Sequence, residues 1–172
     1  MHVDLKKYVR DINDFPIPGI LFRDITTVLN DPTALKSAVD SMMGLLDGVA
    51  FDAVLGPESR GFIFGMPIAY NLGKAFVPVR KAGKLPSEVC KKEYALEYGT
   101  ATIEIHRDAI TAGRRFVVID DLLATGGTAK ATAELIEALG GVVVAQLFFI
   151  ELADLGGRDI LKGQDVRSLL VY

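Results

Sequence analysis

The stretch that decides the fold is RRFVVIDDLLATGGTA, residues 114–129. An uninterrupted apolar run, 116–119, leads into two adjacent acids, Asp120 and Asp121, and then into a loop of small residues before a helical pattern begins. A continuous apolar run is typical of a strand that is buried on both faces. In an open parallel sheet, ligands bind beyond the carboxyl ends of the strands, where loops lead into helices. The stretch therefore predicts a buried parallel strand that ends in a binding site.

Strand-like and helix-like patterns alternate along the rest of the chain. This alternation predicts an α/β fold with a central, mostly parallel sheet flanked by helices. Residues 2–12 read as a short amphipathic helix, and DFPIPGILFRDI, 14–25, reads as an ordered loop because two prolines and a glycine interrupt it. Further strands are expected at 52–56, 76–79, 100–106 and 142–150, and further helices at 62–72, at 128–139 and from Asp31-Pro32 to a point before Gly48.

The composition limits the classes of function. A chain of 172 residues, half of them apolar, fits one domain with a real core. The net charge of −3 offers no basic surface for nucleic acid or for an anionic membrane. No apolar run approaches the roughly 20 residues that span a bilayer, and the start of the chain, MHVDLKKYVRDI, is unlike a signal peptide. The lone Cys90 suits a reducing compartment. We expect a soluble, cytoplasmic protein without nucleic-acid or membrane partners.

The loop after the acids has the chemistry of a phosphate site. Glycines allow close approach of the backbone, and unpaired N–H groups at a helix start attract an anion. The paired acids would repel a phosphate, but they suit the vicinal hydroxyls of a sugar and can help to hold a divalent cation. A tight turn with solvated acids is the alternative. A Walker loop does not fit, because no lysine follows the glycines. The candidate phosphate residues are Ala124, Thr125, Gly126, Gly127 and Thr128.

Two other segments carry cations next to predicted strands. Arg60, in PESRGFIFG, sits where a strand turns into a helix and can hold a diphosphate through paired N–H donors. VRKAGKLP gathers Arg80, Lys81 and Lys84, which can neutralise a diphosphate or form a solvated basic loop.

At these residues the sequence resembles the type I phosphoribosyltransferases. VVIDDLLATGGTA is similar to the family's signature for phosphoribosyl pyrophosphate (PRPP). Four segments that precede it resemble other family motifs and occur in the order found in the family: FPIPGILFRDIT, SRGFIFG, VRKAGKLP and LEYGTATIEIH. The adenine-specific members are the most similar. The resemblance implies the family's fold over 1–172 as a single domain, with a small hood at about 1–30, a flexible flap at about 81–106 and a homodimeric assembly. It also implies a non-proline cis peptide near Glu58-Ser59.

The resemblance further implies an activity, adenine + PRPP ⇌ AMP + diphosphate, a purine salvage reaction that requires Mg²⁺. The cation would be held mainly through PRPP and diphosphate, assisted by Asp120 and Asp121, with no direct protein ligand. Arg60 and Glu97 are the implied catalytic residues, although Glu97 also reads as an ordinary hairpin carboxylate. The implied PRPP-binding residues are Arg60, Arg80, Lys81, Lys84, Asp120, Asp121, Ala124, Thr125, Gly126, Gly127 and Thr128.

The implied adenine pocket consists of Leu21, Phe22, Arg23 and Leu122. Phe22 would stack on the purine, and the main chain near Leu21 and Arg23 would read its edge. Composition alone would place Leu21 and Phe22 in a hydrophobic core.

Two alternatives to this reading stay open. One is a phosphoribosyltransferase for hypoxanthine, guanine or xanthine, although hypoxanthine-guanine enzymes typically carry an aspartate where Ala124 stands. The other is a regulator of the same fold that senses PRPP or purines, which would usually need a DNA-binding segment.

Overall fold

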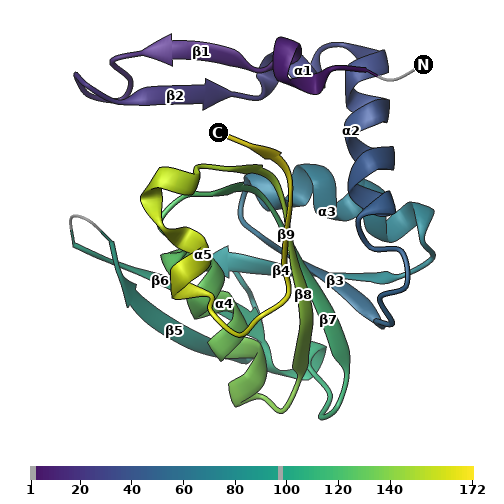
Figure 1. Ribbon diagram of the computed structural model, residues 1–172. Helices are drawn as coiled ribbons and strands as arrows, with labels where there is room; N and C mark the ends of the chain where they lie inside the picture. Colours follow the sequence, from purple (N-terminus) through teal and green to yellow (C-terminus); the bar gives the residue numbers. More distant parts are fainter. Residues whose placement is uncertain (1–2, 97–98) are drawn as a thin grey trace.

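The computed structural model describes residues 3–96 and 99–172, and its centre is a seven-stranded sheet (Figure 1). The strand order is β5-β6-β4-β3-β7-β8-β9, in which β4, β3, β7, β8 and β9 are parallel and the hairpin β5-β6 is antiparallel. The strands are β3 (Ala53–Pro57), β4 (Ala75–Lys81), β5 (Val89–Ala95), β6 (Thr100–His106), β7 (Arg115–Leu123), β8 (Val142–Glu151) and β9 (Val166–Val171). This arrangement confirms the α/β class and the mostly parallel sheet.

Helices cover both faces of the sheet. They are α2 (Pro32–Gly44), α3 (Arg60–Asn71) and α4 (Gly127–Ala138), with short turns α1 (Thr26–Leu29), α5 (Gly157–Ile160), η1 (Leu5–Tyr8), η2 (Arg107–Ala109) and η3 (Ala153–Leu155). The three long helices confirm those expected from the sequence, with shifts of one or two residues at their ends. Within the described ranges, no helix combines the length and the hydrophobicity needed to cross a bilayer.

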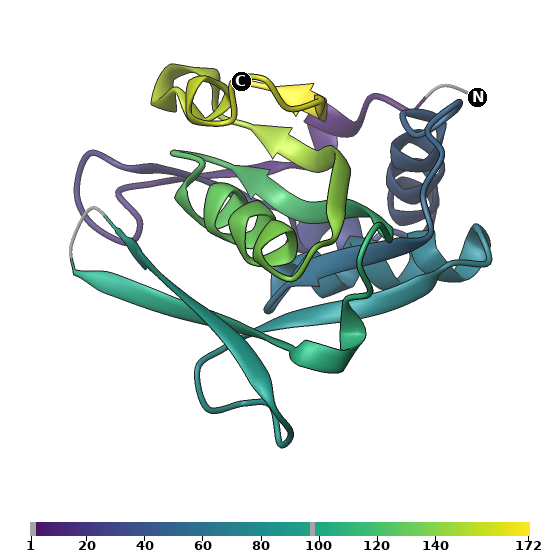
Figure 2. The same ribbon diagram turned by 90° about the horizontal axis from the view of Figure 1, so that it is seen from below.

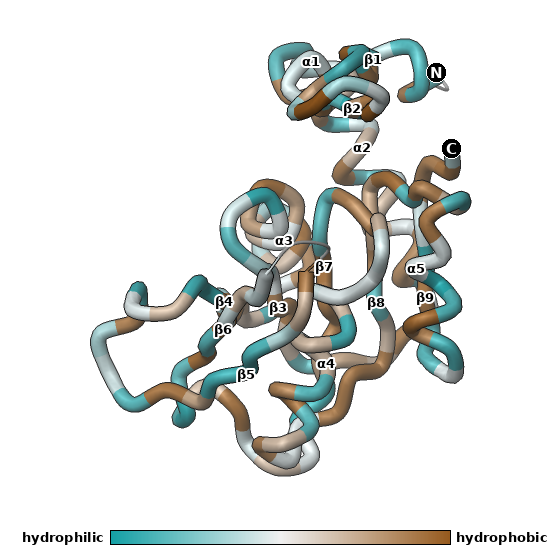
Figure 3. Tube along the Cα trace, turned by 90° about the vertical axis from the view of Figure 1, so that its left-hand side faces the viewer, coloured by the Kyte–Doolittle hydropathy of each residue, from teal (hydrophilic) through white to brown (hydrophobic). Residues whose placement is uncertain are grey.

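The alternation of side chains along the central strands creates two cores. Val117 and Ile119 of β7 pack with α2 and α3 on one face, whereas Phe116 and Val118 pack with α4 on the other. All four side chains are fully buried. In Figure 3 the trace at β3 and β7 is largely brown, which marks the hydrophobic centre of the sheet. The continuous apolar run of β7 therefore reflects burial on both faces.

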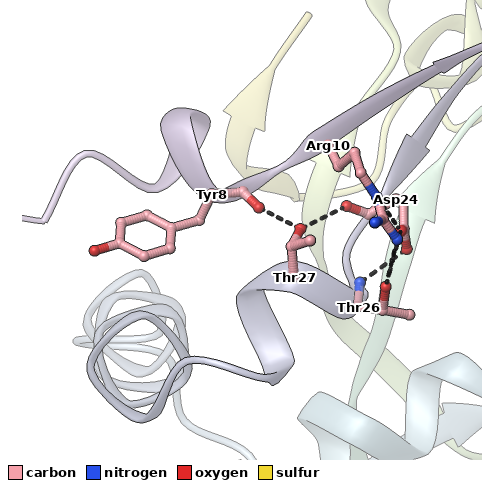
Figure 4. Close-up of polar contacts among 5 residues, drawn as sticks. All are labelled: Tyr8, Arg10, Asp24, Thr26 and Thr27. Carbon is pink, nitrogen blue, oxygen red and sulfur yellow. Dashed lines mark hydrogen bonds and ion pairs between the residues drawn. The ribbon is translucent and has the colours of Figure 1, made fainter.

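The amino-terminal segment forms a small separate layer. β1 (Arg10–Asn13) and β2 (Leu21–Asp24) pair with each other and lie above the main body in Figure 1. The helix expected over 2–12 is wrong beyond η1, and the loop expected over 14–25 contains β2. Figure 4 shows why the strands form: the Asp24 carboxylate, 6% exposed, accepts hydrogen bonds from Arg10 Nε and from the backbone N–H of Thr26. The contact of Arg10 with Asp24 links the two strands, and this pairing overrides the local helical pattern.

The hairpin β5-β6 projects from one edge of the sheet, in teal in Figure 2. It lies within the segment 81–106 that the resemblance implies to be a flap. The structure anchors its first strand to α4, because Lys92 Nζ lies 2.9 Å from Glu134 Oε2. The hairpin thus packs along α4 and, with the carboxyl end of β7, borders one cavity.

Candidate active site

A cavity of about 600 Å³ opens at the carboxyl ends of β3, β4 and β7. The three strands are parallel, so their carboxyl ends meet at one edge of the sheet, as the sequence predicted for the acid pair. The loop between β7 and α4 and the hairpin β5-β6 form the other walls. Its volume lies within the usual range for small-molecule sites. The expected residues that line it are Arg60, Arg80, Lys81, Asp120, Asp121, Leu122, Ala124, Thr125, Gly126, Gly127 and Thr128.

The loop 124–128 ends in an open helix start. α4 begins at Gly127, and its N-cap residue Gly126 has φ +85°, a left-handed conformation that favours glycine. No side chain in the described part of the chain caps this helix, so its first backbone N–H groups remain available to a ligand. Together with the helix dipole, these groups can bind a phosphate.

The acid pair, a half-buried Asp120 and a buried Asp121, lies beside an arginine. Asp121 is 4% exposed, and its Oδ2 lies 3.0 Å from Arg60 Nε, while Asp120 Oδ1 accepts the backbone N–H of Asp121 at 2.8 Å. Burial, and then the neighbouring charge of Asp121, raises the pKa of Asp120 well above its ordinary value. Burial also raises the pKa of Asp121, although the Arg60 guanidinium opposes this shift. The pair is a costly arrangement of two carboxyl groups, which is characteristic of a functional site.

Close packing sets the position of Arg60. A Cβ on the next residue, Gly61, would lie 2.8 Å from Pro57 Cδ and 2.9 Å from the carbonyl oxygen of Ile119. The missing side chain therefore lets the start of α3 rest directly on the end of β7. The peptide bond Glu58-Ser59 is cis, as the resemblance implies.

Glu58 connects this turn to the basic segment. Its Oε2 accepts hydrogen bonds from Arg80 Nε at 3.0 Å and from the backbone N–H of Lys81 at 3.1 Å. These two bonds hold the pKa of Glu58 below its ordinary value, and the bond from Arg80 has the larger effect. The carboxylate therefore holds the Arg80 guanidinium and the backbone of Lys81 at the wall of the cavity.

Four expected residues do not line the cavity, namely Leu21, Phe22, Arg23 and Lys84. Phe22 lies close to it, with its ring centroid 5.9 Å from the guanidinium carbon of Arg60. The Arg23 side chain turns away, pairs with Asp11 and stacks 4.0 Å from the ring centroid of Tyr172. Only its main chain is then left for the base. Glu97 lies outside the described residues.

The cavity also contains residues that the sequence reasoning missed. Tyr94, on β5, places its hydroxyl 3.0 Å from Thr128 Oγ1 and so links the hairpin to the phosphate loop. Thr102, on β6, and Phe148, on β8, line the wall. The only sequence signal for Tyr94 as a site residue was its position as an aromatic residue just before the LEYG motif. Phe148 gave none, because it stands inside a continuous apolar run.

The comparisons with known proteins agree on one family. Residues 32–151 match the family model described as a phosphoribosyl transferase domain. Adenine phosphoribosyltransferase from Lachnoclostridium phytofermentans is 60% identical over 98% of this chain and 97% of its own length. The crystal structure of adenine phosphoribosyltransferase from Thermoanaerobacter pseudethanolicus superposes with a TM-score of 0.96 at 51% identity, covering 98% of each chain.

A more distant solved structure carries ligands. It is adenine phosphoribosyltransferase from Saccharomyces cerevisiae, complexed with adenine and D-2,5-dideoxy-2,5-imino-altritol 1,6-bisphosphate, at 40% identity, with a TM-score of 0.90 and coverage of 96% of each chain. Both the sequence signature and the fold that surrounds this cavity are thus shared with enzymes of one kind. The chain belongs to the phosphoribosyl transferase family and, within it, to the adenine phosphoribosyltransferases.

Proposed function

We propose that the protein catalyses adenine + PRPP ⇌ AMP + diphosphate, as a step of purine salvage. The observation that carries this proposal is the meeting, in one cavity, of the acid pair, the uncapped start of α4 and the cations Arg60 and Lys81. A sugar phosphate that also bears a diphosphate has the groups that match these three features. The relatives named adenine phosphoribosyltransferase support the choice of reaction.

The chemistry requires positioning and charge stabilisation and no protein nucleophile. The bond between the anomeric carbon and the diphosphate oxygen breaks, its electrons leave with the diphosphate, and a ring nitrogen of adenine bonds to that carbon. In this proposal Arg60, Arg80, Lys81 and Lys84 stabilise the negative charge that develops on the leaving group. The base loses its ring N–H proton, for which Glu97 is the proposed acceptor on the grounds of resemblance alone.

The same proposal assigns the binding of the ribose and its phosphate. Asp120 and Asp121 accept hydrogen bonds from the ribose hydroxyls, and the backbone of 124–128 donates to the 5′-phosphate. Asp121 must then exchange part of its contact with Arg60 for contacts with substrate, since the two side chains lie 3.0 Å apart without it.

Mg²⁺ is the proposed cofactor. Among the described residues, no group of three or more His, Cys, Asp or Glu side chains could hold a metal ion. Two adjacent carboxylates do fit a cation that is bound mainly through substrate phosphates, which is the usual arrangement for Mg²⁺. When bound, the ion neutralises charge on the diphosphate. Asp120 and Asp121 would then assist it from the protein side.

The proposed base pocket combines Leu122 with Leu21, Phe22 and Arg23 of the hood. Leu122 lines the cavity, and Phe22 lies against Arg60 at its edge. Ala124 offers no carboxylate to a purine, which suits a 6-amino base better than a 6-oxo base. The ligands of the yeast relative, adenine and an imino-altritol bisphosphate, are consistent with this pairing of sites.

We also propose that the protein acts as a homodimer in the cytoplasm. Phe15, Ile17 and Ile20, between β1 and β2, are 50%, 54% and 46% exposed, and such a group of exposed apolar side chains is typical of a surface that another protein covers. A lone cysteine, Cys90, is typical of proteins in a reducing compartment.

A panel of bases tests the reaction. The protein is incubated with PRPP and Mg²⁺ and with adenine, hypoxanthine, guanine or xanthine, and nucleotide and diphosphate are quantified. We expect AMP from adenine alone and loss of turnover when a chelator is added. Turnover of a 6-oxopurine would overturn the base assignment. Binding of PRPP without turnover of any base would overturn the enzyme and favour a sensor.

A further inference from the structure

The basic loop that follows β4 is wrapped around a buried carboxylate that the proposed mechanism does not use. Glu104, on β6, is 1% exposed. Its Oε1 accepts the backbone N–H groups of Lys84 and Leu85, both at 3.0 Å, and its Oε2 lies 3.6 Å from Lys91 Nζ. The register of the sheet explains this position, because Glu104 stands opposite Arg80, one residue before the end of β4 at Lys81, where the loop begins.

This carboxylate stays charged in spite of its burial. Burial disfavours the ionised form, but hydrogen bonds from the backbone of Leu85 and Lys84, the nearby amide of Gly83 and the charge of Lys91 outweigh it and hold the pKa of Glu104 below its ordinary value. A buried charge without such partners would be strongly destabilising. The loop and the carboxylate therefore stabilise each other.

The same bonds determine how the loop can meet a ligand. The backbone N–H of Lys81 donates to Glu58, that of Ala82 to the carbonyl of Thr102, and those of Lys84 and Leu85 to Glu104. Three amides of the loop 82–85, and that of Lys81 at the end of β4, are thus occupied within the protein. An anion can consequently be bound by the side chains of Lys81 and Lys84. The position of Lys84 depends on the backbone that Glu104 holds, whereas Lys81 ends β4 and its amide is held by Glu58.

We propose that Glu104 is a positioning residue for the diphosphate: it acts as the hydrogen-bond acceptor that fixes the loop 82–85 and so directs Lys84, the lysine of that loop. This inference rests on the proposed function. In the proposed function the diphosphate and the 5′-phosphate occupy different parts of the cavity, and the start of α4 binds the 5′-phosphate. Glu104 is proposed to act on the diphosphate part alone. A change at Glu104 should therefore affect one part and spare the other.

Two substitutions of similar size test the proposal. Glu104→Leu removes the acceptor and leaves two backbone N–H groups unpaired, whereas Glu104→Gln keeps a carbonyl oxygen that can accept both. Binding of magnesium diphosphate and of AMP is measured separately by calorimetry. We expect Glu104→Leu to weaken diphosphate binding by about tenfold or more, Glu104→Gln to stay within about threefold, and AMP affinity to stay within about twofold in both. Glu93→Gln, an exposed glutamate on the neighbouring β5, is the matched control.

Each other outcome contradicts a specific claim. Equal loss of diphosphate and AMP binding would indicate a general structural role for Glu104, and equal loss in the Leu and Gln variants would overturn the acceptor role. If Glu104→Leu does not fold, hydrogen exchange on the unsubstituted protein decides: the amides of Lys84 and Leu85 should exchange slowly, and fast exchange overturns the proposal. Failure of the unsubstituted protein to bind either ligand would refute the proposed function instead.

Discussion

Asp120 and Asp121 show, at the scale of the residue, how the sequence can reveal a site without revealing its energetics. The paired acids after an apolar run predicted a ligand-binding strand end, and the cavity forms there. The burial of Asp121 and its ion pair with Arg60 could not be predicted, because they depend on the close approach of α3, whose first residues Arg60 and Gly61 are remote in the sequence. Tyr94 was missed for the same reason, since its partner Thr128 belongs to another element.

The raised pKa of Asp120 predicts that this carboxylate lowers the stability of the protein near neutral pH. The folded state binds more protons than the unfolded state between the ordinary carboxyl pKa of about 4 and the raised value. Stability should therefore fall as the pH rises through that window, and the loss should persist above it. We expect Asp120→Asn to be more stable than the unsubstituted protein at pH 7, by about 1.4 kcal/mol for each unit of raised pKa.

Urea unfolding of both proteins between pH 3 and pH 8 measures this effect. The difference should vanish below a pH of about 4, where Asp120 is protonated in both states. Asp47→Asn, at an exposed position, should show no comparable gain. A variant that is less stable at pH 7 would refute the electrostatic account. We also expect the gain to coincide with a loss of turnover, because the same carboxyl group is proposed to bind ribose.

At the scale of the element, long periodic segments were predictable and short ones were not. α2 and α4 each bury one face, and their apolar spacing is visible in the sequence. β1 and β2 have only four residues each, and they exist because they pair with each other. The sequence reasoning expected no strand at β5 or β9, and it gave no hint that the short turn α5 supports the phosphate loop.

That support is a contact of backbone on backbone. A Cβ on Gly157, at the start of α5, would lie 2.3 Å from the carbonyl oxygen of Ala124, and one on Gly126 would lie 2.7 Å from the carbonyl oxygen of Gly157. Arg158 holds the segment in place, because its Nε and Nη2 donate to the two oxygens of Glu151 at 2.9 and 2.6 Å.

We therefore expect Gly157→Ala to displace the phosphate loop. The substitution should lower the free energy of unfolding by about 1–3 kcal/mol, as overpacking typically does. It should weaken AMP binding more than diphosphate binding, because the 5′-phosphate is proposed to sit on this loop. Denaturant unfolding and calorimetry measure the two effects. Gly44→Ala is the control, since a Cβ there meets nothing within 4 Å, and equal effects of the two substitutions would contradict the expectation.

At the scale of the whole molecule, the end of the sheet meets the amino-terminal layer. Figure 1 shows the carboxyl terminus below β2. Lys6 Nζ donates to the carbonyl oxygen of Val171 at 2.6 Å, and the Arg23 guanidinium lies 4.0 Å from the ring centroid of Tyr172. The layer that carries the proposed base-binding residues is therefore held by the last two residues of the chain, Val171 and Tyr172, which are remote from it in the sequence. Such a contact is invisible to local patterns.

Tyr172→Ala should loosen this layer and raise the KM for adenine several-fold, while PRPP binding changes by less than about twofold because the body of the site is intact. Steady-state kinetics and proteolysis of the amino-terminal segment measure the two effects. Tyr172→Phe is the matched control: it keeps the ring under Arg23 and removes a hydroxyl that is buried without a partner among the described residues. Since an unpaired buried hydroxyl is destabilising, the Phe variant should be at least as stable as the unsubstituted protein. An unchanged KM for adenine in the Ala variant would show that the base site does not depend on this contact between the layer and the sheet.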